Sequence, residues 1–275
     1  MNTLASSLPL PDALQARAGD NRWWREATLA SLVLLALCLC LSQVDPRTLL
    51  GVSVWTKPAK FYLSIAVYFA TLLLCARFLA DGFWRTVRGR ALTLMTLSTA
   101  IFELAYISAQ AALGEASHFN GSSAFHGVMY SLMGVGAVLL VLGSGWLGIE
   151  IALQRGLESP LVLAVVLGLL LTVLLGGGFG GVLSSNGGHW VGSCRDDVDG
   201  LALLGWSREC GDLRVAHFWG MHAMQALPLG ALVLGSAGAF SERQRWLGVW
   251  IGAVVYAAIG FFLFFTALHG EPILG

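Results

Sequence analysis

The chain has 275 residues, of which 56% are hydrophobic and only 12% are charged, and its mean hydropathy is +0.73. An ordinary soluble domain carries about 25% charged residues, so this composition argues against a water-soluble fold. The 16 basic and 16 acidic residues cancel, and a neutral chain offers no overall electrostatic attraction for nucleic acid.

Seven stretches are apolar enough to cross a bilayer as helices. A hydrocarbon core about 30 Å thick takes about 20 residues of helix, since no backbone amide is left unpaired in lipid. The sequence therefore predicts an all-α, polytopic transmembrane helix bundle with spans near residues 27–44, 61–80, 91–113, 127–152, 160–182, 217–239 and 246–268. The glycine-rich segment 176–181 ends the fifth span, and glycines there permit a close helix approach or a local unwinding.

Arginines orient this bundle, because basic residues in short loops stay in the cytoplasm. They fall on one side of a seven-span arrangement, at Arg17, Arg22, Arg25, Arg85, Arg88, Arg90, Arg155, Arg243 and Arg245. We expect the amino terminus inside and the carboxyl terminus outside. Residues 1–26 are then a cytoplasmic segment without a cleavable signal, and residues 27–275 form one transmembrane domain whose long outer loop covers residues 183–216.

The long outer loop contains two of the five cysteines, Cys194 and Cys210. If the loop faces the oxidising side of the membrane, two cysteines 16 residues apart can close a disulfide that holds the loop together. Two free thiols are the alternative.

All six histidines are expected on or near the outer face, together with other polar residues. His118 and Asn120 stand in the loop before the fourth span and His126 opens that span, with Tyr130 one turn later. Lys57 and Lys60 lie at the start of the second span. The two lysines either bind an anion or balance Glu103, or they extend to the membrane interface as structural anchors.

Glu103 is the most informative single residue, because a carboxyl group near the middle of a span costs about 2.5–3.5 kcal/mol unless it faces protein or water. At helical spacing Tyr106 and Gln110 share its face and lead outward. The functional interpretation is a proton or metal site, and the structural one is a carboxyl hydrogen-bonded to a neighbouring helix.

The sixth span supplies a second polar stripe with His217, His222 and Gln225. By depth, His222 and Gln225 are expected to line one outward-opening cavity together with Glu103. We take Glu103, His222 and Gln225 as the candidate catalytic groups.

A metal site is indicated only by the number and location of the histidines, since no standard metal motif occurs. The candidate ligands are His118, His126, His217 and His222; imidazole suits copper, iron and zinc. His126 and His222 are the best pair for a haem. The spacing of His217 and His222 is poor for two ligands on one straight helix.

Three segments resemble a family of bacterial multi-pass inner-membrane proteins that is uncharacterised. They are Trp55-x-Lys57-Pro58-x-Lys60-Phe61, Ser117-His118-Phe119-Asn120, and Gly211-Asp212-Leu213-Arg214-x-x-His217-Phe218-x-Gly220-x-His222-x-x-Gln225-x-Leu227-Pro228. The resemblance implies the bacterial inner membrane and supplies no reaction. It adds Asp212 and Arg214 to the candidate site residues.

Three functions remain open at this stage. The first is a metal- or haem-dependent redox protein of the membrane, with Glu103 handling protons. The second is a proton-coupled transporter of a small molecule or ion, although the sequence has no clear internal repeat of the kind many transporters show. The third is a non-catalytic sensor or assembly factor whose outer loop docks a partner. In each case the bilayer and a small molecule or metal ion at the outer face are the expected partners.

Overall fold

The computed structural model describes residues 21–194, 200–201 and 204–273. Arg17, used above to orient the chain, lies outside these residues. Within them the chain is almost entirely helical, which confirms the all-α class. The helices are α2 (Arg22–Val44), α3 (Thr56–Cys75), α4 (Val87–Leu113), α5 (Ala124–Arg155), α6 (Pro160–Leu171), α7 (Gly178–Ser185), α8 (Leu213–Met221), α9 (Ala223–Ser236) and α10 (Glu242–Leu268).

Short elements complete the chain. The 3₁₀ turns η1 (Ala76–Phe78) and η2 (Phe83–Arg85) follow α3, and the π-helical segment η3 (Thr172–Gly177) joins α6 to α7. Two antiparallel pairs of two-residue strands are also present: β1 (Thr48–Leu49) with β2 (Val52–Ser53), and β3 (Trp190–Val191) with β4 (Gly211–Asp212).

Local sequence signals set several helix ends. Ser123, Ser159 and Ser241 each accept a hydrogen bond from a backbone N–H in the first turn of the helix that follows, which satisfies one of the unpaired donors there. Pro160 occupies the first turn of α6, where a missing N–H costs nothing. Gly114 ends α4 with a φ of 75°, a left-handed conformation that suits glycine.

Six helical stretches among the described residues are long and apolar enough to cross a membrane. They are Arg22–Val44, Thr56–Phe78, Val87–Leu113, Ala124–Arg155, Pro160–Ser185 and Glu242–Leu268. The outer helices also present apolar side chains to the surroundings, for example Val33 at 68% and Phe262 at 67% exposure. Exposed apolar faces of this kind are typical of a surface that contacts lipid.

The predicted span at residues 217–239 is two helices in the structure. α8 ends at Met221 and α9 begins at Ala223, and His222 between them has φ −89° and ψ 5°, outside the helical region. Neither helix is long enough by itself to cross a bilayer, so this stretch is not among the six.

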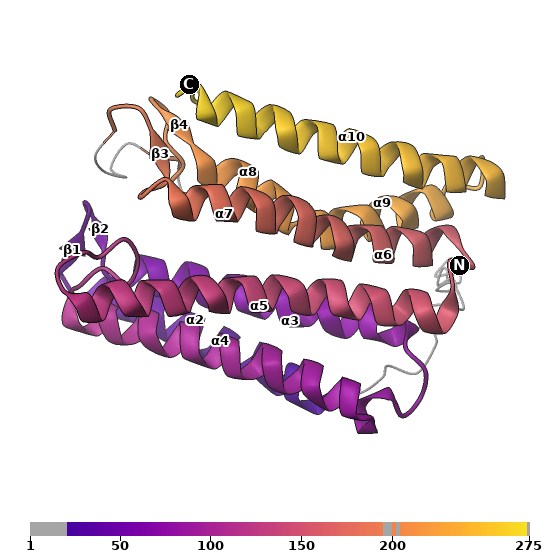
Figure 1. Ribbon diagram of the computed structural model, residues 1–275, viewed down its shortest axis with the longest axis horizontal. Helices are drawn as coiled ribbons and strands as arrows, with labels where there is room; N and C mark the ends of the chain where they lie inside the picture. Colours follow the sequence, from indigo (N-terminus) through magenta and orange to yellow (C-terminus); the bar gives the residue numbers. More distant parts are fainter. Residues whose placement is uncertain (1–20, 195–199, 202–203, 274–275) are drawn as a thin grey trace, which may run out of the picture.

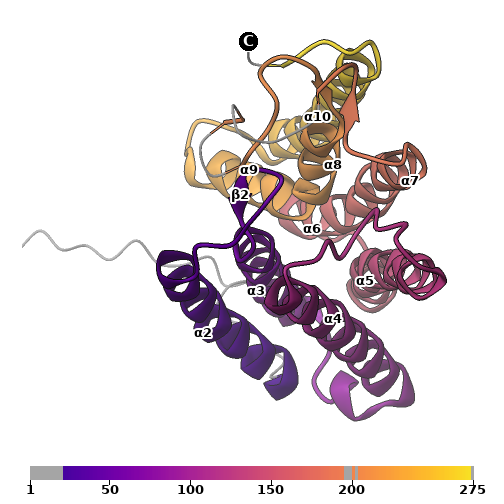
Figure 2. The ribbon, with the colours of Figure 1, turned by 90° about the vertical axis from the view of Figure 1, so that its left-hand side faces the viewer.

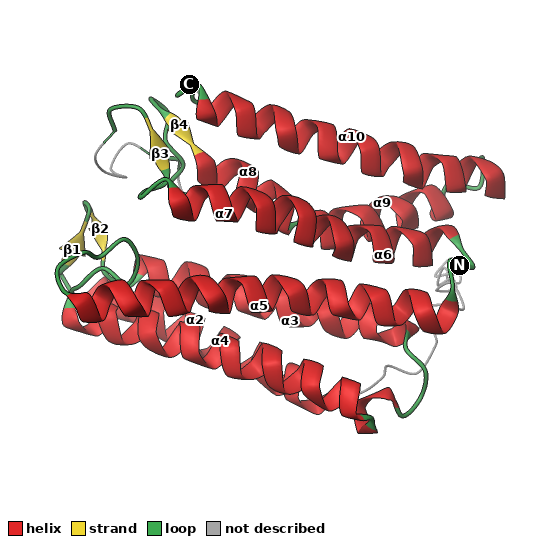
Figure 3. Ribbon diagram, viewed as in Figure 1, coloured by secondary structure: helices red, strands yellow, loops and turns green. Residues whose placement is uncertain are grey.

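The helices lie side by side along the long axis of the molecule (Figure 1), and Figure 2 shows the same bundle end on. α2 packs on α3, α4 on α5, and α5 on α6, while α10 covers α8 and α9. Both strand pairs lie at one end of the bundle (Figure 3), which we call the strand end. The turns η1 and η2 lie at the opposite end, together with the α5–α6 and α9–α10 connections; we call it the arginine end.

Candidate functional site

Glu103 lies buried on α4 and faces α5. Its side chain is 4% exposed. A methyl group placed on Gly136 of α5 would lie 2.5 Å from Glu103 Oε1, so the glycine leaves the space that this oxygen occupies. Oε1 has no hydrogen-bond partner among the described residues. A buried carboxyl oxygen without a partner is costly, by about 1–3 kcal/mol.

Two more groups of the same kind continue the face of α4 that carries Glu103. Tyr106 Oη and Gln110 Oε1 are buried side-chain atoms that likewise have no partner within the described part of the chain. The helical rise places these residues about 4.5 Å and a further 6 Å toward the strand end. We call Glu103, Tyr106 and Gln110 the α4 polar stripe. One further buried side-chain atom, Trp190 Nε1 in β3, also has no hydrogen-bond partner among the described residues.

The spacing of the stripe suits bridging water. A water molecule that joins two oxygen atoms through hydrogen bonds of about 2.8 Å spans up to about 5.6 Å, which covers the rise of about 4.5 Å from Glu103 to Tyr106. The rise of about 6 Å from Tyr106 to Gln110 requires side-chain reach or a second water molecule. Apolar side chains of α3, α4 and α5, among them Phe61, Ile107 and Met133, pack around Tyr106. The surroundings of Tyr106 are therefore mostly apolar.

The inner end of the stripe is closed. Thr96, two turns before Glu103, is fully buried. Its hydroxyl accepts a hydrogen bond from Trp24 Nε1 at 2.9 Å and donates one to Leu92 O at 2.9 Å. Because this hydroxyl, which also lies 3.1 Å from Thr93 O, already has protein partners, Thr96 does not extend the set of unpartnered atoms.

His118 lies at the outer end of the stripe. Its ring packs against Phe61 and Tyr130, with centroids 5.6 and 6.1 Å away, and Nδ1 is 3.1 Å from Ser117 Oγ. Burial, and secondly the charge of Lys57, lowers the pKa of His118 to about 3. The imidazole is therefore neutral at pH 7. Lys57 therefore acts electrostatically on His118, and it acts on Glu103 as well.

His126 and Asn120 organise the loop before α5. His126 Nε2 is 3.0 Å from Glu115 Oε2, and its Nδ1 is 2.8 Å from Ser123 Oγ. Asn120 donates to Ala116 O and accepts from Ser122 N. Both ring nitrogens of His126 thus contact protein groups. Its role as a haem ligand together with His222 stays a prediction.

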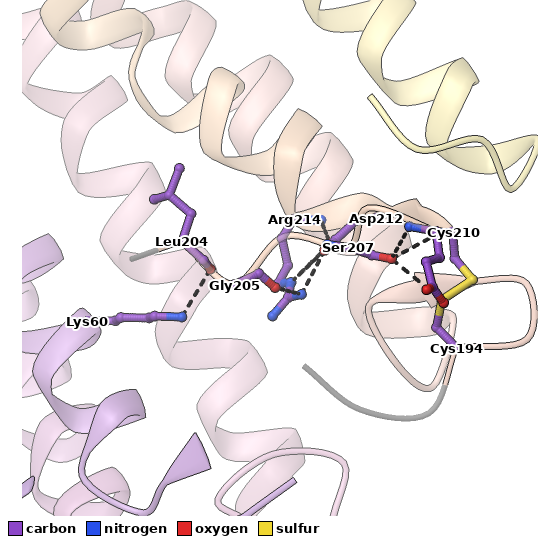
Figure 4. Close-up of polar contacts among 9 residues, drawn as sticks. Lys60, Cys194, Leu204, Gly205, Ser207, Cys210, Asp212 and Arg214 are labelled. Atoms are coloured by element: carbon purple, nitrogen blue, oxygen red, sulfur yellow. Dashed lines mark hydrogen bonds and ion pairs between the residues drawn. A yellow bond between two sulfur atoms is a disulfide. The ribbon is translucent and has the colours of Figure 1, made fainter. Parts of the chain in front are cut away.

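The loop between α7 and α8 is held by a disulfide and by an ion pair (Figure 4). Cys194 and Cys210 form the predicted bridge, with Cα atoms 6.2 Å apart. Asp212 caps α8 by accepting from Arg214 N, and its carboxylate receives the Arg214 guanidinium at 2.7 Å. Asp212 also accepts from Ser207 N. In this arrangement Asp212 and Arg214 fix the loop on the start of α8.

Two contacts connect this loop further. Arg214 donates to Gly205 O at 2.6 Å, and Lys60 Nζ donates to Leu204 O at 3.0 Å. Lys60 belongs to α3, so it links the first half of the bundle to the loop of the second half (Figure 4). This contact gives Lys60 a structural role.

His217, His222 and Gln225 lie around the break between α8 and α9. His217 Nδ1 is 2.9 Å from Gly176 O of η3, and His222 Nδ1 is 3.2 Å from Gln225 Oε1. Gln225 Nε2 donates to Thr71 Oγ1 of α3 at 2.9 Å. The contacts of the described residues thus join His222 to Gln225 and α3, while Glu103 faces α5. Among the described residues no hydrogen bond joins Glu103 to His222 or Gln225, and their grouping in one cavity stays a prediction.

Glu150 is a buried carboxylate that sequence reasoning missed. It is 2% exposed near the arginine end of α5 and lies 3.1 Å from Arg88 of α4. Trp146 Nε1 and Gln154 Nε2 also donate to it. The sequence did contain one signal for this residue, namely a glutamate near the end of a predicted span. Glu150 thus has three partners, whereas Glu103 Oε1 has none among the described residues.

Among the described residues, no group of three or more histidine, cysteine, aspartate or glutamate side chains could hold a metal ion. No protein-family model matches the sequence, and neither a curated protein nor a solved structure is significantly similar to it. The structure is a helical bundle whose apolar helices are long enough to cross a membrane. The α4 polar stripe, whose buried oxygen atoms have no partners among the described residues, leads from the strand end to the carboxyl group of Glu103.

Proposed function

We propose that this chain is a proton-coupled transporter of the bacterial inner membrane, in which Glu103 exchanges a proton with the outer solution along the α4 polar stripe. The observation that carries the proposal is the set of three buried oxygen atoms on one helix face that have no partner among the described residues. Buried polar groups are nearly always paired, so such a set indicates water or an ion. Proton uptake at Glu103 then drives the movement of a small molecule or ion.

Each part of the stripe has a role in this mechanism. Water between Gln110, Tyr106 and Glu103 completes a chain of hydrogen bonds along which a proton can move. The Tyr106 hydroxyl both donates and accepts, so it can pass a proton without changing its charge. Thr96 closes the inner end because its hydroxyl is already paired with Trp24 and Leu92. In the conformation described, the path is therefore open toward one side of the membrane, and release of the proton to the other side requires a second conformation.

The proposed topology has seven crossings, with the strand end outside. α8 and α9 together cover residues 213–236, which as helix is about 36 Å long and sufficient for the seventh crossing. Two arginines at the arginine end, Arg85 at the end of η2 and Arg155 at the end of α5, support a cytoplasmic assignment of that end. The disulfide supports an oxidising environment at the strand end.

Proton uptake into liposomes tests the proposed function. Purified protein is reconstituted with a trapped pH-sensitive dye, and a potassium diffusion potential, negative inside, drives protons inward. We expect acidification well above that of empty liposomes for the unaltered chain, and a fall to the empty-liposome rate for Glu103→Gln. The substitution keeps the shape of the side chain and removes its ionisation.

Glu150→Gln is the matched control, because Glu150 is equally buried but paired with Arg88. It is expected to keep the uptake of the unaltered chain. Equal uptake by Glu103→Gln and the unaltered chain, or no uptake above empty liposomes by either, would overturn the proposal. Solutes that accelerate the Glu103-dependent uptake then identify the cargo.

A further inference from the structure

A groove runs between α2 and α4, and α3 forms its floor. It encloses a cavity of about 230 Å³ that is open on one side. Ile101 of α4 lines the open side and is 65% exposed, whereas Phe69 of α3 lines the floor and is fully buried. We call this feature the α2–α4 groove.

Hydrogen bonds hold α2 and α4 together on both sides of the groove. At the arginine end Asn21 Nδ2 donates to Thr93 Oγ1 at 2.7 Å, and the Trp24–Thr96 bond described above lies beside it. At the strand end Arg47, just beyond α2, donates to Ala112 O at 2.9 Å. The residues that line the cavity fall between these contacts on both helices. Several of them are alanines, whose short side chains leave the space unfilled: Ala27, Ala30, Ala100 and Ala105.

The cavity is suited to an apolar occupant. Only two polar side chains line it, Ser31 and Tyr62, and the Tyr62 hydroxyl is already 2.9 Å from Ser108 Oγ. Cavities lined by apolar side chains stay free of water and take up apolar groups instead. An empty cavity would also deprive its lining of dispersion contacts. For helices of membrane-spanning length, the apolar group at hand is the hydrocarbon chain of a lipid.

The edge of the groove at the arginine end is positively charged. Arg90 precedes Leu97 by seven residues on α4, so it lies on the groove side of that helix, about 10 Å nearer the arginine end. Trp23 has the same relation to Ala30 on α2. Arg90 is exposed, and so is Trp23, at 59%. The guanidinium of Arg22 lies over the Trp23 ring, 5.4 Å from its centroid.

We propose that the α2–α4 groove binds one anionic phospholipid, with an acyl chain in the cavity and the phosphate at Arg90 and Arg22. Tryptophan rings favour the membrane interface, which places Trp23 and the two arginines at the depth of the headgroups. Basic residues between spanning helices at one membrane face attract anionic headgroups. In a zwitterionic lipid the amine offsets the phosphate, so the arginines select the anionic lipid. The site faces α2, whereas Glu103 faces α5, and it does not depend on the proposed transport.

Two substitutions test the two parts of the site separately. Ala30→Phe fills the cavity, and because Ala30 is exposed, the new ring requires no rearrangement of the core. Ala36→Phe is its control, since Ala36 is also exposed but lies about 120° round α2 from Ala30. Arg90→Gln removes a charge from the edge of the groove. Its control is Arg243→Gln, which removes an exposed charge from the first turn of α10 at the same end of the bundle.

The experiment measures bound lipid by native mass spectrometry of purified protein in detergent, with phosphatidylglycerol and phosphatidylethanolamine of identical chains. We expect one phosphatidylglycerol per chain, held at least about fivefold more tightly than phosphatidylethanolamine. Arg90→Gln should weaken phosphatidylglycerol about fivefold and leave phosphatidylethanolamine unchanged. Ala30→Phe should weaken both lipids at least about tenfold, because each buried methylene is worth about fourfold in affinity. Both control variants should bind as the unaltered chain does.

Several results would overturn the proposal. They are equal affinity of the unaltered chain for the two lipids, unchanged binding in Ala30→Phe, and equal weakening by Arg90→Gln and Arg243→Gln. Glycerol 3-phosphate carries the charge of the headgroup without the chains, and we expect it not to displace the lipid. Displacement by glycerol 3-phosphate at equal concentration would contradict a site in which the cavity holds an acyl chain.

Discussion

The Oε1 atom of Glu103 and the Cα atom of Gly136 are so close that a methyl group on Gly136 would lie 2.5 Å from the oxygen. Gly136→Ala must therefore displace the Glu103 carboxyl from its position, although the helix itself tolerates alanine well. We expect proton uptake to fall at least about tenfold, with a stability change within the 1–3 kcal/mol typical of an overpacked core. The two quantities are measured in liposomes and by thermal unfolding in detergent.

Gly134→Ala on the same helix is the control for that prediction. A methyl group on Gly134 meets nothing within 4 Å, so uptake should stay at the level of the unaltered chain. If Gly136→Ala and Gly134→Ala have the same uptake, the position of the Glu103 carboxyl does not control proton movement.

The disulfide between Cys194 and Cys210 should stabilise the outer loop measurably. A closed loop of this length, with a sequence separation of 16 between the cysteines, is worth about 3 kcal/mol in the chain-entropy description. We expect reductant to lower the unfolding temperature of the unaltered chain and to leave a Cys194→Ser/Cys210→Ser double variant unchanged. Thiol labelling of intact membranes gives the direct check, and labelling of both cysteines without reductant would disprove the bridge.

The stability of the folded chain should decrease as the pH is lowered, because His118 is buried as a neutral imidazole. Its pKa is about 3 in the folded chain and about 6.5 when unfolded. Between these values the unfolded state binds a proton that the folded state does not, so stability is lost as pH falls below about 6.5. The loss from this residue is at most about 2 kcal/mol at pH 5. His118→Phe should remove it in denaturant unfolding at pH 5 and 7.5, and a variant with undiminished pH dependence would contradict the burial of a neutral imidazole.

The orientation of the bundle can be measured with reporter fusions. A reporter that is active only outside the cytoplasm should be inactive when fused after Gly156, between α5 and α6, and active when fused after Gly188, beyond α7. The expectation follows from the arginines at one end and the disulfide at the other. Activity in the opposite pattern would place the α4 polar stripe open to the cytoplasm.

Much of this architecture follows from the sequence, because hydrophobic segments of about 20 residues have few alternatives in a bilayer. Helical spacing alone put Tyr106 and Gln110 on the face of Glu103, and the two loop cysteines indicated the disulfide. The interruption at His222 was not predictable from its own segment. It depends on the contact of η3 with α8, where a methyl group on Gly220 would lie 2.5 Å from Gly176 N.

Side-chain pairs between helices that are distant in the sequence could not be predicted either. Glu150 is paired with Arg88, and Thr96 with Trp24, across separations of 62 and 72 residues. Such pairs depend on the order and rotation of packed helices, and periodicity within one helix carries no information about either. For the same reason the sequence grouped Glu103 with His222 and Gln225 by depth alone, whereas the packing directs them to different neighbours.

Infrared difference spectroscopy between acid and alkaline outer solutions tests the central claim most directly, because it observes the carboxyl proton itself. We predict a carboxyl C=O band that changes with the pH of the outer solution, shifts when that solution is made with D₂O, disappears in Glu103→Gln and persists in Glu150→Gln. A spectrum in which Glu103→Gln retains every pH-dependent carboxyl band of the unaltered chain would contradict proton exchange at Glu103.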